Sequence, residues 1–244
     1  MSAAARRVDA VNNSDSLPAW ASTLGVFDLE TTGIDVRSSR IVSAFVGVIG
    51  PDGRTVESRS WLADPGVEIP EQASAVHGIS TERARAEGRP AAEVVAEIAG
   101  ALGELFSRGL AVVAYNAPYD FSLLAAETDR YGVPAVTAHP VVDPLVIDKQ
   151  VDRYRKGKRT LEAAAQCYGV ELHDAHDAGA DAIAAGRVAQ AIARAHHDAL
   201  ELPAPELHLA QQTWFREQSE RYQDFVRRTR DPTFTASTGW PVRG

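Results

Sequence analysis

The sequence contains one cysteine and no long apolar run, and each of these absences excludes a class of protein. A single cysteine, Cys167, excludes an internal disulfide, and its helical pattern beside Leu161 and Tyr168 predicts a buried thiol. No stretch is long enough to span a membrane, and no apolar signal-peptide core follows Arg6 and Arg7. We therefore expect a cytoplasmic protein without a membrane partner.

The sequence also lacks an excess of positive charge, which restricts its partners. It has 25 Lys and Arg against 33 Asp and Glu, a formal net charge of −8 at pH 7. Broad non-specific binding to duplex nucleic acid requires a basic surface, so the composition argues against it. An enzyme that holds only a few nucleotides beside metal ions is compatible with this charge.

The length of 244 residues suits one domain with extensions. Residues 1–19 are rich in Ala, Ser, Asn and Asp without periodicity, which predicts a disordered tail. Residues 20–200 are expected to form the main domain, and residues 201–244 a C-terminal helical extension. The helix expected over residues 206–228 carries many apolar side chains, so we expect it to dock on the main domain or on a partner.

Apolar runs and turn signals predict an α/β fold. Three strands come first, and the strong turn at residues 50–53 makes them part of an antiparallel meander. Two further strands then alternate with helices, a pattern typical of a mixed sheet covered by helices. The five expected strands cover residues 24–29, 41–49, 55–62, 110–115 and 141–142. The main expected helices cover residues 90–105, 116–131 with Asn116 as cap, 160–168, 178–196 and 206–228, and another begins at Asp143.

The first expected strand ends in two carboxylates. Side chains alternate along a strand, so Asp28 and Glu30 point to the same face. Two adjacent acids on a buried strand repel each other and lose hydration, and no Lys or Arg lies within this stretch. A bound divalent ion is the simplest compensation. The alternative is a strand end that leans into solvent with two hydrated acids.

Two further acids occupy apolar faces of expected helices. Asp120 shares a face with Leu123 and Leu124. Asp181 shares one with apolar residues at helical spacing, namely Ala184, Ala185, Val188 and Ile192. The helix dipole stabilises an acid in the first turn even in solvent, but both of these acids point toward the core. His176 lies five residues before Asp181, so we expect it on a loop beside the site that Asp181 helps to form.

Four carboxylates and one histidine indicate the kind of metal and the kind of chemistry. Oxygen ligands suit Mg²⁺ or Mn²⁺, whereas zinc would require more His or Cys at ligand spacing. The cluster matches two-metal phosphoryl transfer, in which one ion generates hydroxide and the other stabilises the leaving oxygen. A neutral imidazole nearby can accept the proton of the attacking water.

Four short motifs stand in order along the chain. They are Phe-Asp-Leu-Glu-Thr-Thr-Gly at 27–33, Val-His-Gly-Ile at 76–79, Ala-Tyr-Asn-Ala-Pro-Tyr-Asp at 114–120 and His-Asp-Ala-Gly-Ala-Asp at 176–181. In this set the chain resembles the DEDDh 3′–5′ exonucleases, the group of the proofreading epsilon subunit of bacterial DNA polymerase III. The sister class has Tyr where Asp177 stands here, whereas His176 occupies the His-class position. The resemblance implies a ribonuclease H-like three-layer fold with a central mixed five-stranded sheet.

The resemblance also implies which side chains perform catalysis. Asp28 would bridge two ions, Mg²⁺ or Mn²⁺, and three further acids would complete the metal site. These acids are Glu30, Asp120 and Asp181. His176 is implied as the general base.

Substrate contacts follow from the same resemblance. Leu29, Thr31 and His77 would contact the terminal nucleotide, and Asn116 would shape the helix start beneath Asp120. The implied reaction is hydrolysis from the 3′ end of single-stranded nucleic acid, with release of nucleoside 5′-monophosphates. DNA proofreading or repair is the leading expectation and RNA trimming the alternative, and the sequence does not separate them.

Two other functional classes remain as alternatives. An inactive member could serve as a nucleic-acid-binding module, but this would be favoured by loss of a ligand, and none is lost. A phosphatase with an aspartyl nucleophile usually has Asp-x-Asp after its first strand, where this chain has Asp28-x-Glu30.

Two segments outside the motifs bear on partners. Residues 153–159 contain five cations, which form either a solvated loop or a contact for substrate phosphates. Residues 211–215, Gln-Gln-Thr-Trp-Phe, loosely resemble a sliding-clamp-binding peptide but lie inside a helical pattern. The expected partner is therefore the 3′ end of a single strand, with a DNA polymerase or a sliding clamp as less favoured protein partners.

Overall fold

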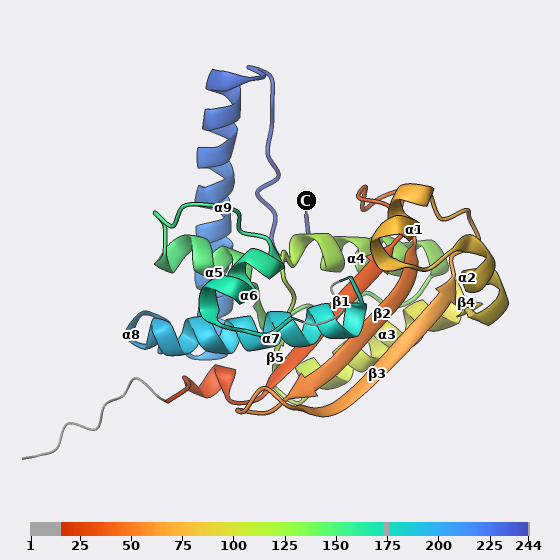
Figure 1. The fold of residues 1–244 in the computed structure, drawn as a ribbon, viewed down its shortest axis with the longest axis horizontal. Helices are drawn as coiled ribbons and strands as arrows, with labels where there is room; N and C mark the ends of the chain where they lie inside the picture. Colours follow the sequence, from red (N-terminus) through yellow and green to blue (C-terminus); the bar gives the residue numbers. More distant parts are fainter. Residues whose placement is uncertain (1–15, 173–175, 244) are drawn as a thin grey trace, which may run out of the picture.

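The computed structural model describes residues 16–172 and 176–243 and shows a mixed sheet with helices on both faces (Figure 1). The strand order is β4-β3-β2-β1-β5-β6. β1, β2 and β3 pair antiparallel, as the predicted meander requires, and β5 and β6 continue the sheet in parallel beside β1. The strands are β1 Leu24–Thr31, β2 Ile41–Ile49, β3 Thr55–Asp64, β4 Arg89–Pro90, β5 Ala111–Val113 and β6 Val141–Val142.

The prediction of five strands was wrong, because the sheet has six. β4 is a two-residue strand that runs parallel to the end of β3, with Pro90 opposite Asp64. Two residues have no periodicity, and a proline argues against a strand, so the pattern gave no signal. Gly88 permits the close approach, since a Cβ there would lie 2.5 Å from the backbone nitrogen of Asp64. The helix expected from Pro90 begins instead at Ala91.

Helices form a layer on each face of the sheet, which confirms the predicted α/β architecture (Figure 1). One buried cluster joins the sheet to α3 and α4, and a second joins it to α5, α6 and α7. No helix in the described ranges is long and apolar enough to cross a membrane. The helical elements are η2 Ala19–Ala21, α1 Glu71–His77, α2 Thr81–Glu87, α3 Ala91–Ser107, α4 Pro118–Tyr131, α5 Pro144–Val151, α6 Leu161–Tyr168, α7 Ala178–Ala195, α8 His197–Leu200 and α9 Ala204–Thr229.

Side-chain caps explain where four of these helices begin. In each case a side-chain oxygen of the preceding residue accepts a hydrogen bond from a backbone N–H group of the first turn, which would otherwise lack a partner. The capping residues are Ser80 for α2, Asp143 for α5, Thr160 for α6 and Asp177 for α7. The predicted starts at Asp143 and Thr160 are thereby confirmed.

The cysteine lies elsewhere than expected. Cys167 is exposed on α6, so the prediction of a buried thiol was wrong. Ala164 and Ala165 take the buried positions of this short helix instead. A helix of two turns has room for few core positions, and here small alanines occupy them against α7.

The alternation of side chains along β1 determines which face of the sheet its two carboxylates occupy. Phe27 and Leu29 belong to the cluster on the α3–α4 face, whereas Val26 belongs to the cluster under α7. By alternation, Asp28 and Glu30 also face α7. The α7 helix lies close to this strand at Gly186, where a Cβ would stand only 2.6 Å from side-chain atoms of Val26 and Ile49. This close packing brings the N-terminal turn of α7 to the end of β1.

The C-terminal extension packs on the main domain through the first half of α9. Leu207, His208 and Gln211 are buried there. The second half of α9 rises away from the body, and the last residues run alongside it back to the domain (Figure 1). Trp240, near the end of the chain, is buried against the His208 ring, with centroids 4.9 Å apart. Docking on the main domain is thus what the structure shows for this half of α9.

Most of the tail predicted to be disordered, residues 1–19, lies outside the described residues. The described end is packed on the domain. Trp20 in η2 is buried, and its indole N–H donates a hydrogen bond to the carbonyl of Leu200 at 2.9 Å. The ordered domain therefore includes the turn that begins at Ala19.

Candidate active site

The carboxylates of β1 meet a third acid from the first turn of α7. Oxygen atoms of Asp28, Glu30 and Asp181 all lie within 4.8 Å of one another. The strand alternation places the first two on the α7 face, and the close approach at Gly186 brings the third to them. The predicted convergence of these three acids is confirmed.

The fourth predicted acid, Asp120, lies in the first turn of α4 and is buried, with 3% of its surface exposed. Its Oδ1 accepts a hydrogen bond from the backbone N–H of Leu29 at 3.2 Å. Leu29 lies between Asp28 and Glu30 in the sequence, so this bond places the Asp120 carboxylate beside the end of β1. Asp120 also contributes to the negative charge felt by Asp28. The four acids therefore come from three separate elements, as expected.

The electrostatics of the cluster call for positive charge. Burial, followed by the negative charges of Asp120, Glu30 and Asp181, raises the pKa of Asp28 well above its ordinary value. Burial and the charge of Asp181 raise the pKa of Glu30 to about 8. Burial likewise raises the pKa of Asp120 and of Asp181. The charged form of each carboxylate is thus disfavoured, and an accompanying cation would favour it.

The donor set fits a divalent cation. Oδ1 of Asp181 is buried and has no hydrogen-bond partner among the described residues, although a buried carboxylate oxygen normally has one. No His or Cys joins the three-acid group in the described part of the chain. All-oxygen donors suit hard ions, so the residues present fit a divalent metal of that kind.

His176 lies in a turn before α7, as predicted, with an exposed side chain. Its backbone is left-handed, with φ of 71°, and its backbone N–H donates a hydrogen bond to Oδ2 of Asp181 at 3.3 Å. The next residue, Asp177, caps α7 by accepting bonds from Gly179 and Ala180 at 3.0 Å each. The turn therefore holds His176 at the edge of the acid cluster.

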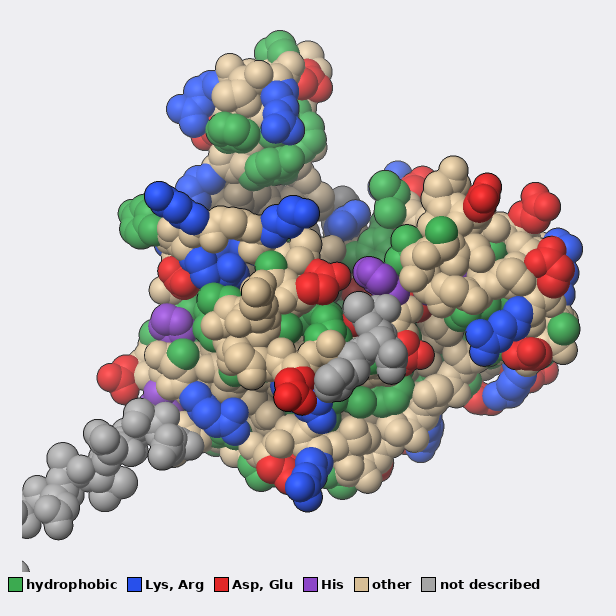
Figure 2. Space-filling view, viewed as in Figure 1, with side chains coloured by type: hydrophobic (Ala, Val, Ile, Leu, Met, Phe, Trp, Pro, Cys, Tyr) green, Lys and Arg blue, Asp and Glu red, His purple; other side chains and the backbone are tan. Residues whose placement is uncertain are grey.

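A cleft of about 380 Å³ opens beside these residues, and Figure 2 shows it as a hollow between α7 and the α1–α2 region. His77 and His176 line the cleft together with Glu30. Nδ1 of His77 accepts a hydrogen bond from the backbone N–H of Ile79 at 3.2 Å, and Nε2 is buried without a partner among the described residues. Burial lowers the pKa of His77, which favours the neutral imidazole.

The other three residues predicted to contact substrate, Leu29, Thr31 and Asn116, are not among the residues that line the cleft. The Thr31 hydroxyl is largely buried and donates a hydrogen bond to the carbonyl of Gly33 at 2.8 Å. The Leu29 side chain packs in the core on the α3–α4 face, and its backbone N–H is the part that reaches Asp120. Asn116 is exposed just before α4.

The prediction that Asn116 caps α4 was wrong. The N-cap position belongs to Ala117, without a side-chain hydrogen bond. Asn116 has a left-handed backbone, with φ of 62°, and its N–H and that of Ala117 each donate to the carboxylate of Asp143 at 3.0 Å. Burial raises the pKa of Asp143 to about 6, while these hydrogen bonds oppose the shift. The buried acid that follows β6 therefore organises the turn that carries Asp120.

Sequence reasoning assigned no role to two residues at the site. The Tyr119 hydroxyl contacts the Thr31 hydroxyl and donates to the carbonyl of Gly33 at 2.6 Å. Burial raises the pKa of Tyr119, and the nearby site carboxylates add to this effect. Arg83, from α2, lines the cleft. Tyr119 directly precedes Asp120 in the third motif, which was the available signal, whereas Arg83 stands in no motif.

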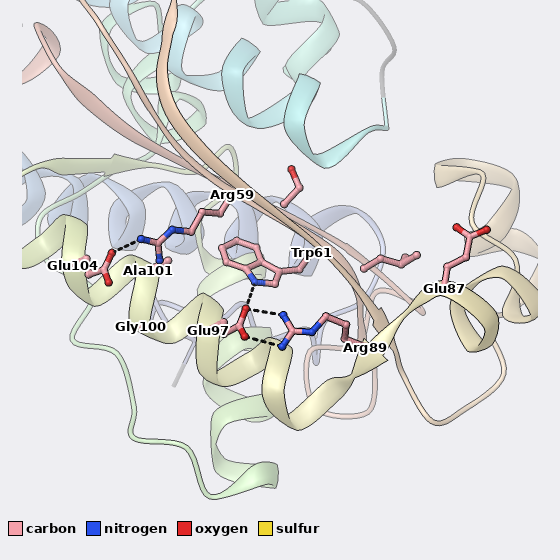
Figure 3. Close-up of a pocket in the computed structure, with 10 residues that line it drawn as sticks. Arg59, Trp61, Glu87, Arg89, Glu97, Gly100, Ala101 and Glu104 are labelled. Atoms are coloured by element: carbon pink, nitrogen blue, oxygen red, sulfur yellow. Dashed lines mark hydrogen bonds and ion pairs between the residues drawn. The ribbon is translucent and has the colours of Figure 1, made fainter.

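A larger cavity of about 560 Å³ lies elsewhere, between β3, α2 and α3 (Figure 3). Four of its charged side chains are paired with one another, and the fifth, Glu87, pairs with Arg83. Arg89 binds both oxygens of Glu97 at 2.9 and 2.7 Å, the Trp61 indole donates to Glu97 at 2.8 Å, and Arg59 donates to Glu104 at 2.9 Å. None of the predicted catalytic acids lines this cavity. Its side chains are occupied structurally, so the smaller cleft is the candidate site.

The arrangement of four acids on β1, α4 and α7 agrees with a comparison of the whole chain with known families. A model of the exonuclease family matches residues 26–189, which include all four acids and His176. The chain belongs to the exonuclease family. This membership confirms the resemblance to the DEDD exonucleases and the prediction of a nuclease of the hydrolase class.

Individual relatives show the same relationship. The exonuclease domain is 28% identical over 183 residues to a DNA polymerase III of PolC type from Streptococcus thermophilus, a match over 75% of this chain and 12% of that protein. The chain thus spans only a small part of that relative. Exonuclease I of E. coli in complex with a dA16 oligonucleotide superposes with a TM-score of 0.61, at 20% identity over 72% of this chain and 42% of that one. The zinc-bound form of its complex with single-stranded DNA gives 0.60, at 21% identity over 72% and 41%. These likenesses establish the ribonuclease H-like fold.

Proposed function

We propose that this protein is a metal-dependent 3′–5′ exonuclease that releases nucleoside 5′-monophosphates from the 3′ end of single-stranded nucleic acid, and that DNA is its substrate. The observation that carries the proposal is the convergence of Asp28, Glu30 and Asp181 beside a cleft lined by His176. Two further findings favour DNA: the PolC-type relatives are DNA polymerases, and the exonuclease I structures contain DNA oligonucleotides.

The metal site is proposed to consist of Asp28, Glu30, Asp120 and Asp181. The chemistry that two Mg²⁺ or Mn²⁺ ions supply when bound is neutralisation of these acids and stabilisation of negative charge at the scissile phosphate. Asp28 is the residue best placed for a shared role, because it lies among the three other acids: burial first, and then their charges, raise its pKa. The oxygen-only donor set favours Mg²⁺ or Mn²⁺ over zinc in this chain.

His176 is proposed as the general base. It lies next to the acid cluster, and its side chain lines the cleft, so it can accept the proton of the attacking water. The hydrogen bond from its backbone N–H to Asp181 couples its position to a proposed metal ligand. This placement supports assignment to the His class of the family.

His77 and Thr31 are proposed to hold the terminal nucleotide. Because Nδ1 of His77 accepts a hydrogen bond, the ring proton lies on Nε2, which is buried and has no partner among the described residues. That N–H can donate to a phosphate or sugar oxygen in the cleft. Leu29 is proposed to contact the same nucleotide, and Asn116 to shape the start of α4 beneath Asp120.

A ribonuclease of the same family, or an inactive nucleic-acid-binding member, is the alternative to this proposal. A polymerase partner is consistent with the PolC-type relatives. A sliding clamp is disfavoured, because Gln211 of the clamp-like peptide is buried and its amide is hydrogen-bonded within the fold.

The test is incubation of the protein with matched DNA and RNA oligonucleotides labelled at the 5′ end. We expect a ladder of progressively shorter labelled products with Mg²⁺ or Mn²⁺, release of 5′-monophosphates and no reaction in EDTA. Removal of nucleotides from the 5′ end, or cleavage that is unaffected by EDTA, would contradict the proposal. Faster shortening of RNA than of DNA would favour the ribonuclease alternative.

A further inference from the structure

The basic segment at residues 153–159, between α5 and α6, is held on its inner side by a buried carboxylate. The Asp148 side chain is fully buried. Its Oδ2 accepts from Arg155 at 2.5 Å and from Arg159 at 2.7 Å, and its Oδ1 accepts from the Tyr168 hydroxyl at 2.8 Å. Two of the five cations in the segment therefore fix its shape.

The other cations point outward, together with an aromatic ring. Arg153, Lys156 and Lys158 are exposed, and none of them forms an ion pair within the part of the chain that the structure describes. Tyr154 is 86% exposed, and the Arg153 guanidinium lies 5.9 Å from its ring centroid. A large exposed aromatic beside three unpaired cations is unusual on a chain of net charge −8.

The segment adjoins the candidate site. The Tyr115 hydroxyl, at the turn that leads to α4, donates to the carbonyls of Arg159 and Thr160 at 2.9 and 3.2 Å. The pKa of Glu162, in the first turn of α6, is lowered mainly by its hydrogen bond with Thr160, and the nearby His176 and Lys158 add to this effect. Figure 2 shows Lys and Arg side chains over the loop between α5 and α6, on the face that carries the cleft.

We propose that Arg153, Tyr154, Lys156 and Lys158 form an outer strand-binding surface. It would hold the single-stranded nucleic acid that leads into the cleft, with phosphates on the cations and a base stacked on Tyr154. Single strands are bound in this way by a basic track combined with exposed aromatic rings. An acidic protein could pair with the cations but would leave the exposed ring without a role. The inference rests on the proposed function and adds the position of the nucleic acid that precedes the 3′ end bound in the cleft.

The first test measures binding in EDTA, where hydrolysis does not interfere. The probe is a fluorescent oligothymidylate of about 20 nucleotides, followed by anisotropy over a range of salt concentrations. For the variant Arg153→Gln/Lys156→Gln/Lys158→Gln we expect affinity to fall roughly tenfold or more at low salt, and the salt slope to fall by about 2, near 0.7 per lost contact. Tyr154→Ala should weaken binding about tenfold without changing the salt slope, because it removes stacking and no charge.

A matched control removes three cations away from this face. Arg54, Arg59 and Arg108 lie on the β2–β3 hairpin and at the end of α3, and each has an acidic partner. Their triple replacement by Gln should leave the salt slope near the wild-type value. If the two triple variants weaken oligonucleotide binding equally, only the net charge of the protein matters, and the proposal is overturned. Melting temperatures of all variants should match the wild type, because every altered side chain is exposed.

The second test separates this surface from the catalytic site. With Mg²⁺, KM for the long oligonucleotide should rise about tenfold in the triple variant, whereas hydrolysis of the p-nitrophenyl ester of thymidine 5′-monophosphate should be unchanged. If the triple variant loses activity on both substrates, or keeps full activity on both, the proposal of an outer strand-binding surface is overturned. If the wild type hydrolyses neither substrate, the proposed function fails, and the anisotropy measurement still decides whether the surface binds a single strand.

Discussion

The side-chain oxygen of Gln211 accepts a hydrogen bond from the backbone N–H of Asp143 at 2.7 Å. The same amide donates to the carbonyl of Val141 at 3.0 Å, so a side chain of α9 occupies the place of a further strand beside β6. The Asp143 carboxylate in turn accepts from Asn116 and Ala117 at the start of α4. The C-terminal helix is therefore connected through two residues to the turn that positions Asp120.

Replacement of Gln211 by Leu should destabilise the protein. The change leaves the N–H of Asp143 and the carbonyl of Val141 buried without partners, which costs about 1–3 kcal/mol. For a chain of this size, at about 2–4 °C per kcal/mol, we expect the melting temperature to fall by roughly 2–12 °C. Gln212→Leu, at the half-buried neighbouring position, should have a smaller effect. If both variants have the melting temperature of the wild type, the hydrogen bonds of Gln211 to Asp143 and Val141 do not stabilise the fold.

These contacts also show what could be predicted from the sequence and what could not. Asp28, Glu30 and Asp181 were found from strand alternation and helix spacing, because both periods are local properties of the chain. The cap assigned to Asn116 failed because the true acceptor, Asp143, lies 27 residues further along. A local rule cannot detect an acceptor that follows another strand of the sheet.

The docking of α9 shows the same limit. Its apolar side chains predicted docking on the main domain or on a partner. The residues that fix its position, His208 and Gln211, are polar and do not contribute to that apolar pattern. Their role follows from the backbone groups of the edge strand β6, which become visible only when the sheet is assembled. The two-residue strand β4 was missed for a related reason, because its only evidence is its partner β3.

The free energy of unfolding of the metal-free protein should depend on pH through Glu30. Its pKa is 4.5 for the ordinary side chain and about 8 in the fold, because of burial and the charges of Asp181 and Asp177. Between these values the folded state binds more protons than the unfolded chain. The stabilising contribution is therefore complete below the ordinary value and is lost as the pH rises through about 8.

The measurement is thermal unfolding in EDTA between about pH 5.5 and about pH 8.5, for the wild type and Glu30→Gln. We expect the wild type to lose stability relative to the variant as the pH rises. Added Mg²⁺ should raise the wild-type melting temperature most at the alkaline end, where the acids are ionised. Parallel pH profiles of the two proteins in EDTA would contradict the shifted pKa.

Replacement of Asp28 by Asn should separate stability from catalysis. Exonuclease activity should fall by roughly 10³-fold or more, because several kcal/mol of charge stabilisation by the ions is lost. The metal-free protein should keep or gain stability, because a buried carboxylate next to three other acids is removed. Calorimetric titration with Mn²⁺ should show weakened binding. Asp224→Asn, at an exposed position on α9, serves as the control, and near-normal turnover of Asp28→Asn would end the two-metal proposal.

Replacement of His176 by Ala should impair the chemical step and spare the metal site. His176 contacts Asp181 through its backbone N–H, which the variant retains, so Mn²⁺ affinity and melting temperature should stay close to the wild type. Loss of a positioned general base should lower the single-turnover rate by about 10²–10⁴-fold. Added imidazole should restore part of the rate in His176→Ala but not in Asp28→Asn, because only the first has an intact metal site. A variant that keeps the full rate at saturating Mg²⁺, from acidic to alkaline pH, would remove His176 as the base and with it the assignment to the His class, while the nuclease proposal would stand on the four acids.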